Sequence, residues 1–228
     1  MQTYEALAGM VDHLLLRPEL SDDEIAEGCR VAREYRVASV VVRPSDVDAA
    51  MRWMEGSPVK LASTVGYPDG STSTAVKLYE GRDLLRRGAR ELDITINVGK
   101  LISRQFQYVE MELMQMAKSC QEAGALLKVS IGTRYLTEDL KVIAAKILRR
   151  IEAPMITVDY DLHELRLMQS QLKERLLMKA ACGVESLAQA LEVEESGCHR
   201  FGTTETASIL EDWKTQLEQQ ASGAAAEG

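Results

Sequence analysis

ELDITIN, residues 91–97, and LLKVSIG, residues 126–132, are the two stretches that decide the fold. Side chains alternate between the two faces of a β-strand, so Leu92 and Ile94 share one face while Asp93 lies on the other. The second stretch repeats this pattern and sets Lys128 on the polar face. A strand that is apolar on one face and charged on the other suits a barrel whose outer face packs against helices. We therefore expect Asp93 and Lys128 to point into a barrel interior.

Outward from these stretches, short β-branched runs alternate with longer amphipathic stretches along the whole chain. The expected strands are 11–16, 38–42, 59–65, 91–96, 126–131, 155–158, 176–180 and 200–202. The expected helices are 22–35, 45–54, 74–87, 106–120, 138–150, 162–172, 184–195 and 204–218. Strand followed by helix, repeated eight times, predicts parallel pairing.

Two closures satisfy this order: an open doubly wound sheet or a (β/α)8 barrel. The 228 residues fit eight units of a barrel. Neither GxGxxG nor GxxxxGK[ST] follows the first strand, which weakens the open nucleotide-binding alternative. We predict the α/β class and a single-domain (β/α)8 TIM barrel over residues 1–220. The small and polar residues 221–228 are expected to form a disordered tail.

Composition excludes several classes of partner. Hydrophobic residues make up 46% of the chain and the formal net charge is −8, with both signs mixed along the sequence. This balance disfavours nucleic acid, whose phosphates need clustered Lys and Arg. No export signal and no long apolar run is present, so we expect no membrane association and a cytoplasmic location. The four cysteines and three histidines are scattered, so we expect reduced thiols, no metal and no cofactor.

Charged residues on the polar faces of the strands are the candidate site. Asp93, Lys128 and Lys179 would face the interior, and Lys60 has the same phase in its strand. Buried charges are costly unless paired, and their clustering predicts a functional site at the carboxyl ends of the strands. The alternative is that each lies at a frayed strand end in solvent. Two neighbouring lysines would lower each other's pKa, which suits imine formation with Asp93 moving protons.

The sequence resembles the class I deoxyribose-phosphate aldolases over most of its length. Seven motifs in order carry the resemblance: DHLLL with Pro18 (12–18), ASVVVRP (38–44), VGYPDG (65–70), ELDITINVG (91–99), LKVSIGT with LT (127–137), MKAACG (178–183) and RFGTT (200–204). The resemblance implies that Asp93 is a proton relay and that Lys179 is the second active-site lysine. It also implies that Asp12 and Lys128 are polar residues around the site.

The resemblance further implies a phosphate site at Gly183, Gly202 and Thr204, with a small aldehyde or a sugar phosphate as ligand. A homodimer is expected by analogy with the family.

The sixth strand departs from the family pattern. The family has a Schiff-base lysine there, whereas this chain has Thr157, and no lysine lies between Lys146 and Lys173. The loop that follows is shortened before residue 162. Glu205 replaces a small residue and its carboxylate would repel phosphate, while Cys182 replaces the first of two glycines.

Three interpretations stay open. In the first, the barrel lacks the usual retro-aldol turnover, because Thr157 replaces the Schiff-base lysine, and serves ligand binding, regulation or an unknown protein partner. In the second, the chain is an active carbon–carbon lyase that uses Lys179 or Lys128 as the imine-forming lysine, with Asp93 and Tyr160 moving protons. In the third, the barrel runs a different, non-covalent reaction or uses Cys182 as nucleophile, although a small buried thiol is the expected state of that cysteine.

Overall fold

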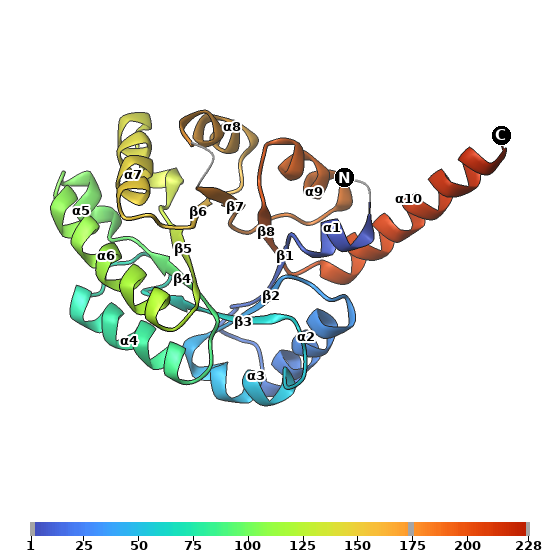
Figure 1. Cartoon of the computed structure of the whole chain (residues 1–228), viewed down its shortest axis with the longest axis horizontal. Helices are drawn as coiled ribbons and strands as arrows, with labels where there is room; N and C mark the ends of the chain where they lie inside the picture. Colours follow the sequence, from blue (N-terminus) through green and yellow to red (C-terminus); the bar gives the residue numbers. More distant parts are fainter. Residues whose placement is uncertain (1–2, 173–175, 227–228) are drawn as a thin grey trace.

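Eight parallel strands close into a barrel in sequence order, with β8 pairing back onto β1 (Figure 1). The computed structural model describes residues 3–172 and 176–226. The strands are β1 (Val11–Leu15), β2 (Ser39–Val42), β3 (Lys60–Val65), β4 (Glu91–Thr95), β5 (Leu126–Ser130), β6 (Met155–Val158), β7 (Leu177–Ala180) and β8 (Arg200–Thr203). All eight predicted strands are present, and the predicted (β/α)8 barrel class is confirmed.

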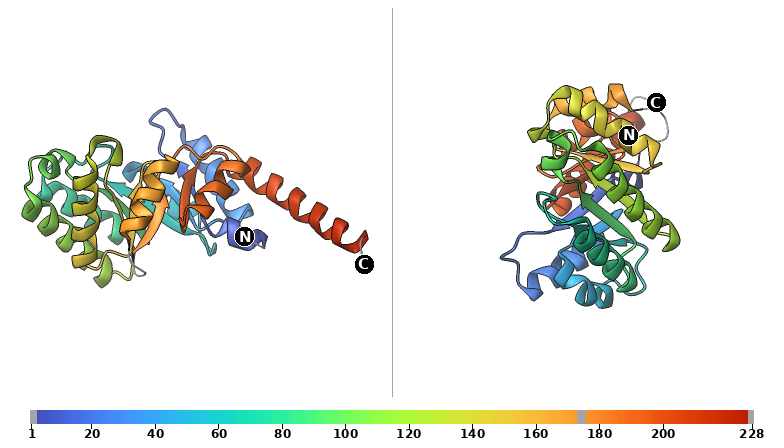
Figure 2. Two further views of the ribbon diagram at one scale, coloured as in Figure 1. Left: turned by 90° about the horizontal axis from the view of Figure 1, so that it is seen from above. Right: turned by 90° about the vertical axis from the view of Figure 1, so that its left-hand side faces the viewer.

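Helices follow the strands and cover the outside of the barrel (Figures 1 and 2). They are α1 (Tyr4–Ala8), α2 (Asp22–Glu34), α3 (Val47–Trp53), α4 (Thr74–Arg86), α5 (Val98–Ile102), α6 (Phe106–Glu122), α7 (Glu138–Arg150), α8 (Leu162–Gln171), α9 (Leu187–Glu195) and α10 (Thr206–Ala226). The five-residue helices α1 and α5 were not predicted, because one turn leaves no periodic pattern. The expected helix 45–54 is divided into a 3-10 turn, Pro44–Asp46, and α3.

Local signals set the helix ends. Ser21 and Glu24 form a capping box at the start of α2. Gly88, Gly124 and Gly197 have φ values of 109°, 63° and 82°, the left-handed conformation that a side chain would disfavour. These glycines end α4, α6 and α9 and turn the chain into the next strand.

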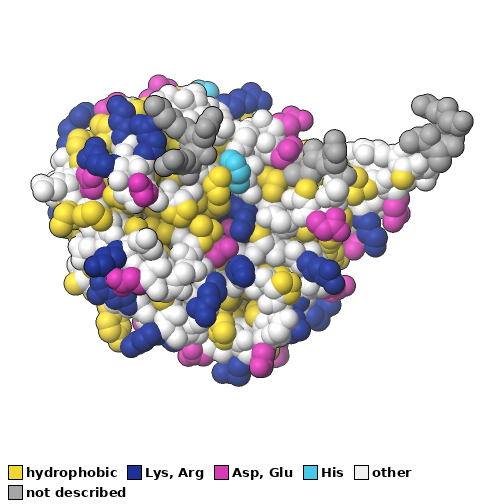
Figure 3. Space-filling view, viewed as in Figure 1, with side chains coloured by type: hydrophobic (Ala, Val, Ile, Leu, Met, Phe, Trp, Pro, Cys, Tyr) yellow, Lys and Arg dark blue, Asp and Glu magenta, His cyan; other side chains and the backbone are white. Residues whose placement is uncertain are grey.

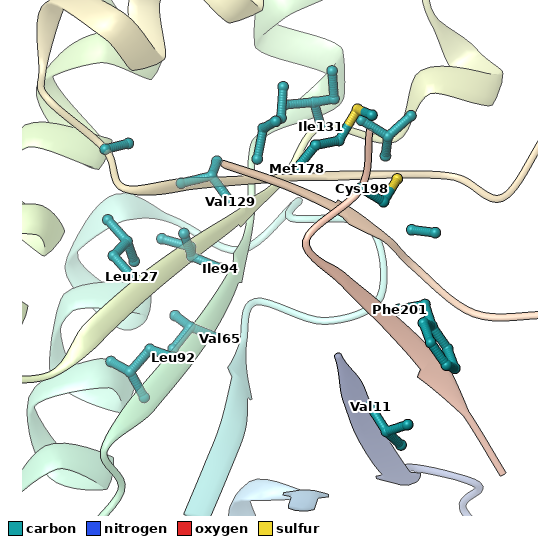
Figure 4. Packing of buried hydrophobic residues seen from close by; sticks show 14 of the residues in the cluster. Val11, Val65, Leu92, Ile94, Leu127, Val129, Ile131, Met178, Cys198 and Phe201 are labelled. Carbon is teal, nitrogen blue, oxygen red and sulfur yellow. The ribbon is translucent and has the colours of Figure 1, made fainter. Parts of the chain in front are cut away.

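The hydrophobic core lies between the strands and the helices rather than inside the barrel. Figure 4 shows Leu92 and Ile94 of β4 and Leu127 and Val129 of β5 among the buried side chains of this layer. Each of these four side chains is at most 1% exposed. The apolar faces predicted from alternation are therefore the faces that pack against the helices.

A buried ion pair fastens two helices to the carboxyl end of β4. Lys77 of α4 and Glu112 of α6 are both 0% exposed, and Lys77 Nζ lies 2.8 Å from Glu112 Oε1. The same Nζ donates a 2.8 Å hydrogen bond to the Thr95 carbonyl, and Thr74 Oγ1 donates to Glu112 Oε2. Helices α4 and α6 are therefore tied to the strand that carries Asp93.

Helix α10 packs its first half against α1 and α9 and then extends away from the barrel (Figures 1–3). It continues through Ala226, so residues 221–226 of the expected tail are helical, and residues 227–228 lie outside the described residues. Figure 3 shows basic and acidic side chains interspersed on the visible face. Within residues 3–172 and 176–226, no helix is both long and apolar enough to cross a membrane.

Candidate active site

Asp12 of β1 is the centre of a charged cluster inside the barrel. Its side chain is 0% exposed, and its Oδ2 lies 2.8 Å from both Lys128 Nζ of β5 and Lys179 Nζ of β7. Its Oδ1 lies 2.8 Å from Arg200 Nη1 of β8 and accepts a 2.7 Å hydrogen bond from Ser39 Oγ of β2. One carboxylate therefore joins four other strands across the lumen.

Two further carboxylates complete the cluster from β4. Asp93 Oδ2 accepts a 3.0 Å hydrogen bond from Lys179 Nζ. Glu91 Oε2 lies 3.0 Å from Lys128 Nζ, and Glu91 Oε1 lies 3.4 Å from Arg200 Nη2. Three carboxylates thus face three cations, so the cluster has no formal net charge and its burial is tolerated.

Strand register explains why these side chains meet. Asp93 is paired with Thr64 of β3 and Lys128 of β5, and inward positions recur every second residue along each strand. The predicted phase of Asp93, Lys128 and Lys179 therefore agrees with the contacts. The expectation for Lys60 is wrong. Lys60 is the first residue of β3, and its side chain is exposed because the strand begins at the amino-terminal end of the barrel.

Charge pairing sets the protonation of the cluster. Burial alone would raise the pKa of Asp12, but Lys128, Lys179 and Arg200 hold that pKa well below its usual range. Burial alone would lower the pKa of Lys179, but Asp12 and Asp93 outweigh it and raise that pKa above the ordinary lysine value. The expected lowering of the Lys179 pKa by a second lysine is therefore not what the geometry gives, because two carboxylates lie 2.8 and 3.0 Å from Lys179 Nζ.

Thr157 of β6 lies in the same inward layer as Ser130 and Lys179, its register partners on β5 and β7. It is 3% exposed, and its Oγ1 has no hydrogen-bond partner among the described residues. A buried hydroxyl without a partner costs about 1–3 kcal/mol.

The ends of β7 and β8 are packed backbone to backbone. A Cβ at Gly202 would lie 1.9 Å from the Ala181 carbonyl oxygen, so only glycine fits there. Gly183 has a φ of 97°, and a Cβ there would lie 3.5 Å from the Tyr160 ring. Thr203 Oγ1 donates a 2.6 Å hydrogen bond to the Val184 carbonyl, which joins the two loops. Gly183, Gly202 and Thr204 therefore lie together at this end of the barrel.

The loops after β5 and β6 are held together by Asp159. Its carboxylate accepts hydrogen bonds from Thr133 Oγ1 at 3.1 Å and from the Arg134 backbone and guanidinium at 3.0 and 2.7 Å. Only residues 159–161 separate β6 from α8, so this loop is short. Cys182 is exposed, so the expectation of a buried thiol is wrong: the residue lies beyond the last residue of β7, in a loop.

Arg200 and Glu91 are the site residues that sequence reasoning did not single out. Both lie at inward positions two residues before Gly202 and Asp93, so the alternation already contained the signal. No group of three or more His, Cys, Asp or Glu side chains in the described part of the chain is arranged to hold a metal ion.

A parallel barrel with paired lysines and carboxylates in its lumen defines the class of aldolase-like (β/α)8 barrels. The chain is 32% identical over 217 residues to a deoxyribose-phosphate aldolase of Bacteroides thetaiotaomicron, covering 92% of this chain and 91% of the relative. It is 34% identical over 214 residues to that of Thermococcus kodakarensis, covering 90% and 96%. The chain belongs to the deoxyribose-phosphate aldolase family.

Solved structures agree with this assignment. An aldolase described as QR15 superposes with a TM-score of 0.86 at 30% identity, over 92% of this chain and 96% of that one. The deoxyribose phosphate aldolase of Aeropyrum pernix, described as a tetramer, superposes with a TM-score of 0.87 at 25% identity, over 94% and 93%. No family model matches the chain.

Proposed function

We propose that this barrel binds a small aldehyde or sugar without the covalent imine step of a Schiff-base aldolase. The observation that carries the proposal is Thr157, the inward side chain of β6 beside Lys179. A threonine has no amine, and no lysine lies between Lys146 and Lys173 to take its place. Without an imine the central step of the retro-aldol reaction is missing.

The two remaining lumen lysines are poor substitutes. Imine formation needs an unprotonated amine, but Lys179 is 2% exposed, lies between Asp12 and Asp93, and has a raised pKa. Lys128 is 0% exposed and lies 2.8 Å from Asp12 and 3.0 Å from Glu91. An aldehyde would have to break an ion pair and enter the packed lumen to reach either nitrogen.

The barrel then acts as a binding protein, in which the unpartnered hydroxyl of Thr157 is the group that can form a hydrogen bond with a carbonyl or hydroxyl of the ligand. A regulatory role, with a protein partner that responds to the bound ligand, belongs to the same proposal. So do a cytoplasmic location, as expected from the sequence, and a homodimer, which rests on the family resemblance.

The competing function is an active lyase that uses Lys179 or Lys128. Two observations favour it: the relatives named above are aldolases, and Lys179 Nζ lies 3.0 Å from the Asp93 carboxylate that would move the proton. In this alternative, the ion pairs of Lys179 with Asp12 and Asp93 break when the substrate binds, which frees the amine.

Reductive trapping separates the two functions. The protein is incubated with acetaldehyde or deoxyribose 5-phosphate, treated with borohydride, digested and analysed by mass spectrometry. We expect adducts only on exposed lysines such as Lys60, equal in wild type and in Lys179→Arg. A substrate-dependent adduct on Lys179 or Lys128, accompanied by turnover, would establish the lyase and refute the proposal.

Thr157→Lys is the companion variant. If the threonine alone blocks the reaction, this variant acquires a trapped adduct at position 157. If it acquires none, the surrounding lumen also excludes imine formation, which agrees with a binding role. Soluble expression and an unchanged circular dichroism spectrum are the control for folding.

A further inference from the structure

One sector of the barrel mouth, formed by the loops after β6, β7 and β8, is strongly acidic. Asp159, Asp161, Glu185 and Glu205 lie in these loops, which contain no Lys or Arg over residues 159–161, 181–186 and 203–206. Arg134, from the loop after β5, is the cation paired with Asp159. A ligand that enters along this sector therefore meets a negative potential, which weakens the binding of anions.

Glu205 lies at the position where a barrel of this class usually binds a phosphate. The loops after strands 7 and 8, with a helix N-terminus, form that site in many (β/α)8 barrels. Glu205 is the residue before α10, and its carbonyl accepts the 3.0 Å hydrogen bond from Ile209 N that begins the helix. Its carboxylate is stabilised by the partial positive charge of the helix end.

Three polar groups at this helix end already have partners within the chain. Thr204 Oγ1 donates a 2.9 Å hydrogen bond to Glu205 Oε1, and the Glu205 amide donates to Thr203 Oγ1 at 2.9 Å. Thr206 Oγ1 lies 2.8 Å from His13 Nδ1, which is buried. A phosphate group would have to displace these contacts and approach a carboxylate at close range.

A second observation concerns a buried polar group that has no hydrogen-bond partner. Thr157 Oγ1 is buried without a partner at the inward end of the same sector. A hydroxyl in that state is satisfied when a ligand oxygen or nitrogen reaches it. The sector thus combines one buried hydroxyl that lacks a hydrogen-bond partner, that of Thr157, with carboxylates that repel an anion.

We propose that Glu205 determines specificity and that the site takes an unphosphorylated ligand, neutral or cationic, such as a free sugar, a small aldehyde or an amino sugar. The inference rests on the proposed binding function and gives its ligand class. It separates this chain from relatives whose names state a phosphorylated substrate.

The test uses inorganic phosphate as probe and ¹⁵N-labelled protein observed by NMR. We expect no saturable shift of the amides at 204–207 in wild type. In Glu205→Gln, which keeps the shape and removes the charge, we expect phosphate to bind at these amides at least about tenfold more tightly than in wild type, equivalent to about 1.4 kcal/mol. Glu218→Gln, the same change of charge further along α10, should behave as wild type.

Saturable phosphate shifts at residues 204–207 in wild type would overturn the proposal, and so would the absence of any gain in Glu205→Gln. A parallel titration compares deoxyribose with deoxyribose 5-phosphate, and a preference of wild type for the phosphorylated sugar would also overturn it. A trapped adduct with acetaldehyde but not with deoxyribose 5-phosphate would refute the non-covalent function while supporting this ligand class. The two proposals therefore fail separately.

Discussion

Replacing Asp12 by asparagine removes one negative charge from the middle of the buried cluster and leaves its size unchanged. In wild type, Asp12 lies 2.8 Å from Lys128, Lys179 and Arg200. The variant removes all three of these contacts at once and leaves three cations to share the two carboxylates of Glu91 and Asp93.

The expected loss follows from this burial. Removing one partner of a buried ion pair costs about 3–5 kcal/mol. For a chain of this length each kcal/mol lowers the melting temperature by about 2–4 °C, so the variant should melt roughly 6–20 °C lower. Asp93→Asn is the matched control, because it removes the same charge from a residue that has one cationic partner at 3.0 Å. It should lose only about 1.5–3 kcal/mol, the range for a hydrogen bond to a charged group.

Urea unfolding at pH 7 measures both free energies, and an acid titration checks the cause. The folded-state pKa of Asp12 lies well below its usual range, so its contribution is fully present above the unfolded pKa of about 3.9 and is lost as pH falls below it. Asp12→Asn should therefore show a shallower loss of stability below pH 4. A loss under about 1 kcal/mol, or one no larger than that of Asp93→Asn, would refute the role of Asp12 as the centre of the cluster.

Three further predictions concern single side chains. Thr157→Val removes the unpartnered hydroxyl and should stabilise the free protein by about 1 kcal/mol in urea unfolding while weakening the binding of deoxyribose; a loss of stability would show that the hydroxyl has a partner. Burial lowers the pKa of His13 to about 4, so stability should fall by up to about 3 kcal/mol as pH drops from 6.5 to 4, and His13→Gln should flatten that slope. A thiol reagent should rapidly label one of the four cysteines of the native protein, and Cys182→Ser should abolish this label. The other three react slowly because burial raises the pKa of Cys29, Cys120 and Cys198 to about 12. Rapid labelling of a second cysteine would contradict the packing.

Alternation along strands was enough to place the lumen charges. ELDITIN and LLKVSIG predict the inward side of Asp93 and Lys128, because a strand with one apolar face has one possible phase in a closed barrel. Lys60 fails because alternation says which face a side chain takes and not how near it is to the end of the strand. The wrong expectation for Cys182 has another origin: it rested on the general preference of free cysteines for the interior, whereas this cysteine lies in the loop after Ala180, the residue at which the strand was expected to end.

The pairing of charges could not be predicted from one sequence. Asp12 and Arg200 are 188 residues apart and meet only because β8 closes onto β1. The number of carboxylates around Lys179 decides the direction of its pKa shift, and this number depends on the side chains of three strands at once. Alternation along each strand therefore predicts which charged residues enter the lumen, whereas the closed barrel decides which of them form ion pairs.

Closure of the barrel also orders the events of folding. The first strand pairs with the last, Val11 beside Phe201, so the ring cannot form until almost the whole chain has been synthesised. Contacts this distant in sequence are slow to form. Until then Asp12 lacks Arg200, and its charge stays hydrated because nothing yet shields it from water. Expulsion of water from the lumen is therefore a late, concerted step, and a chain cut before residue 200 would keep an open edge and a wet, charged interior.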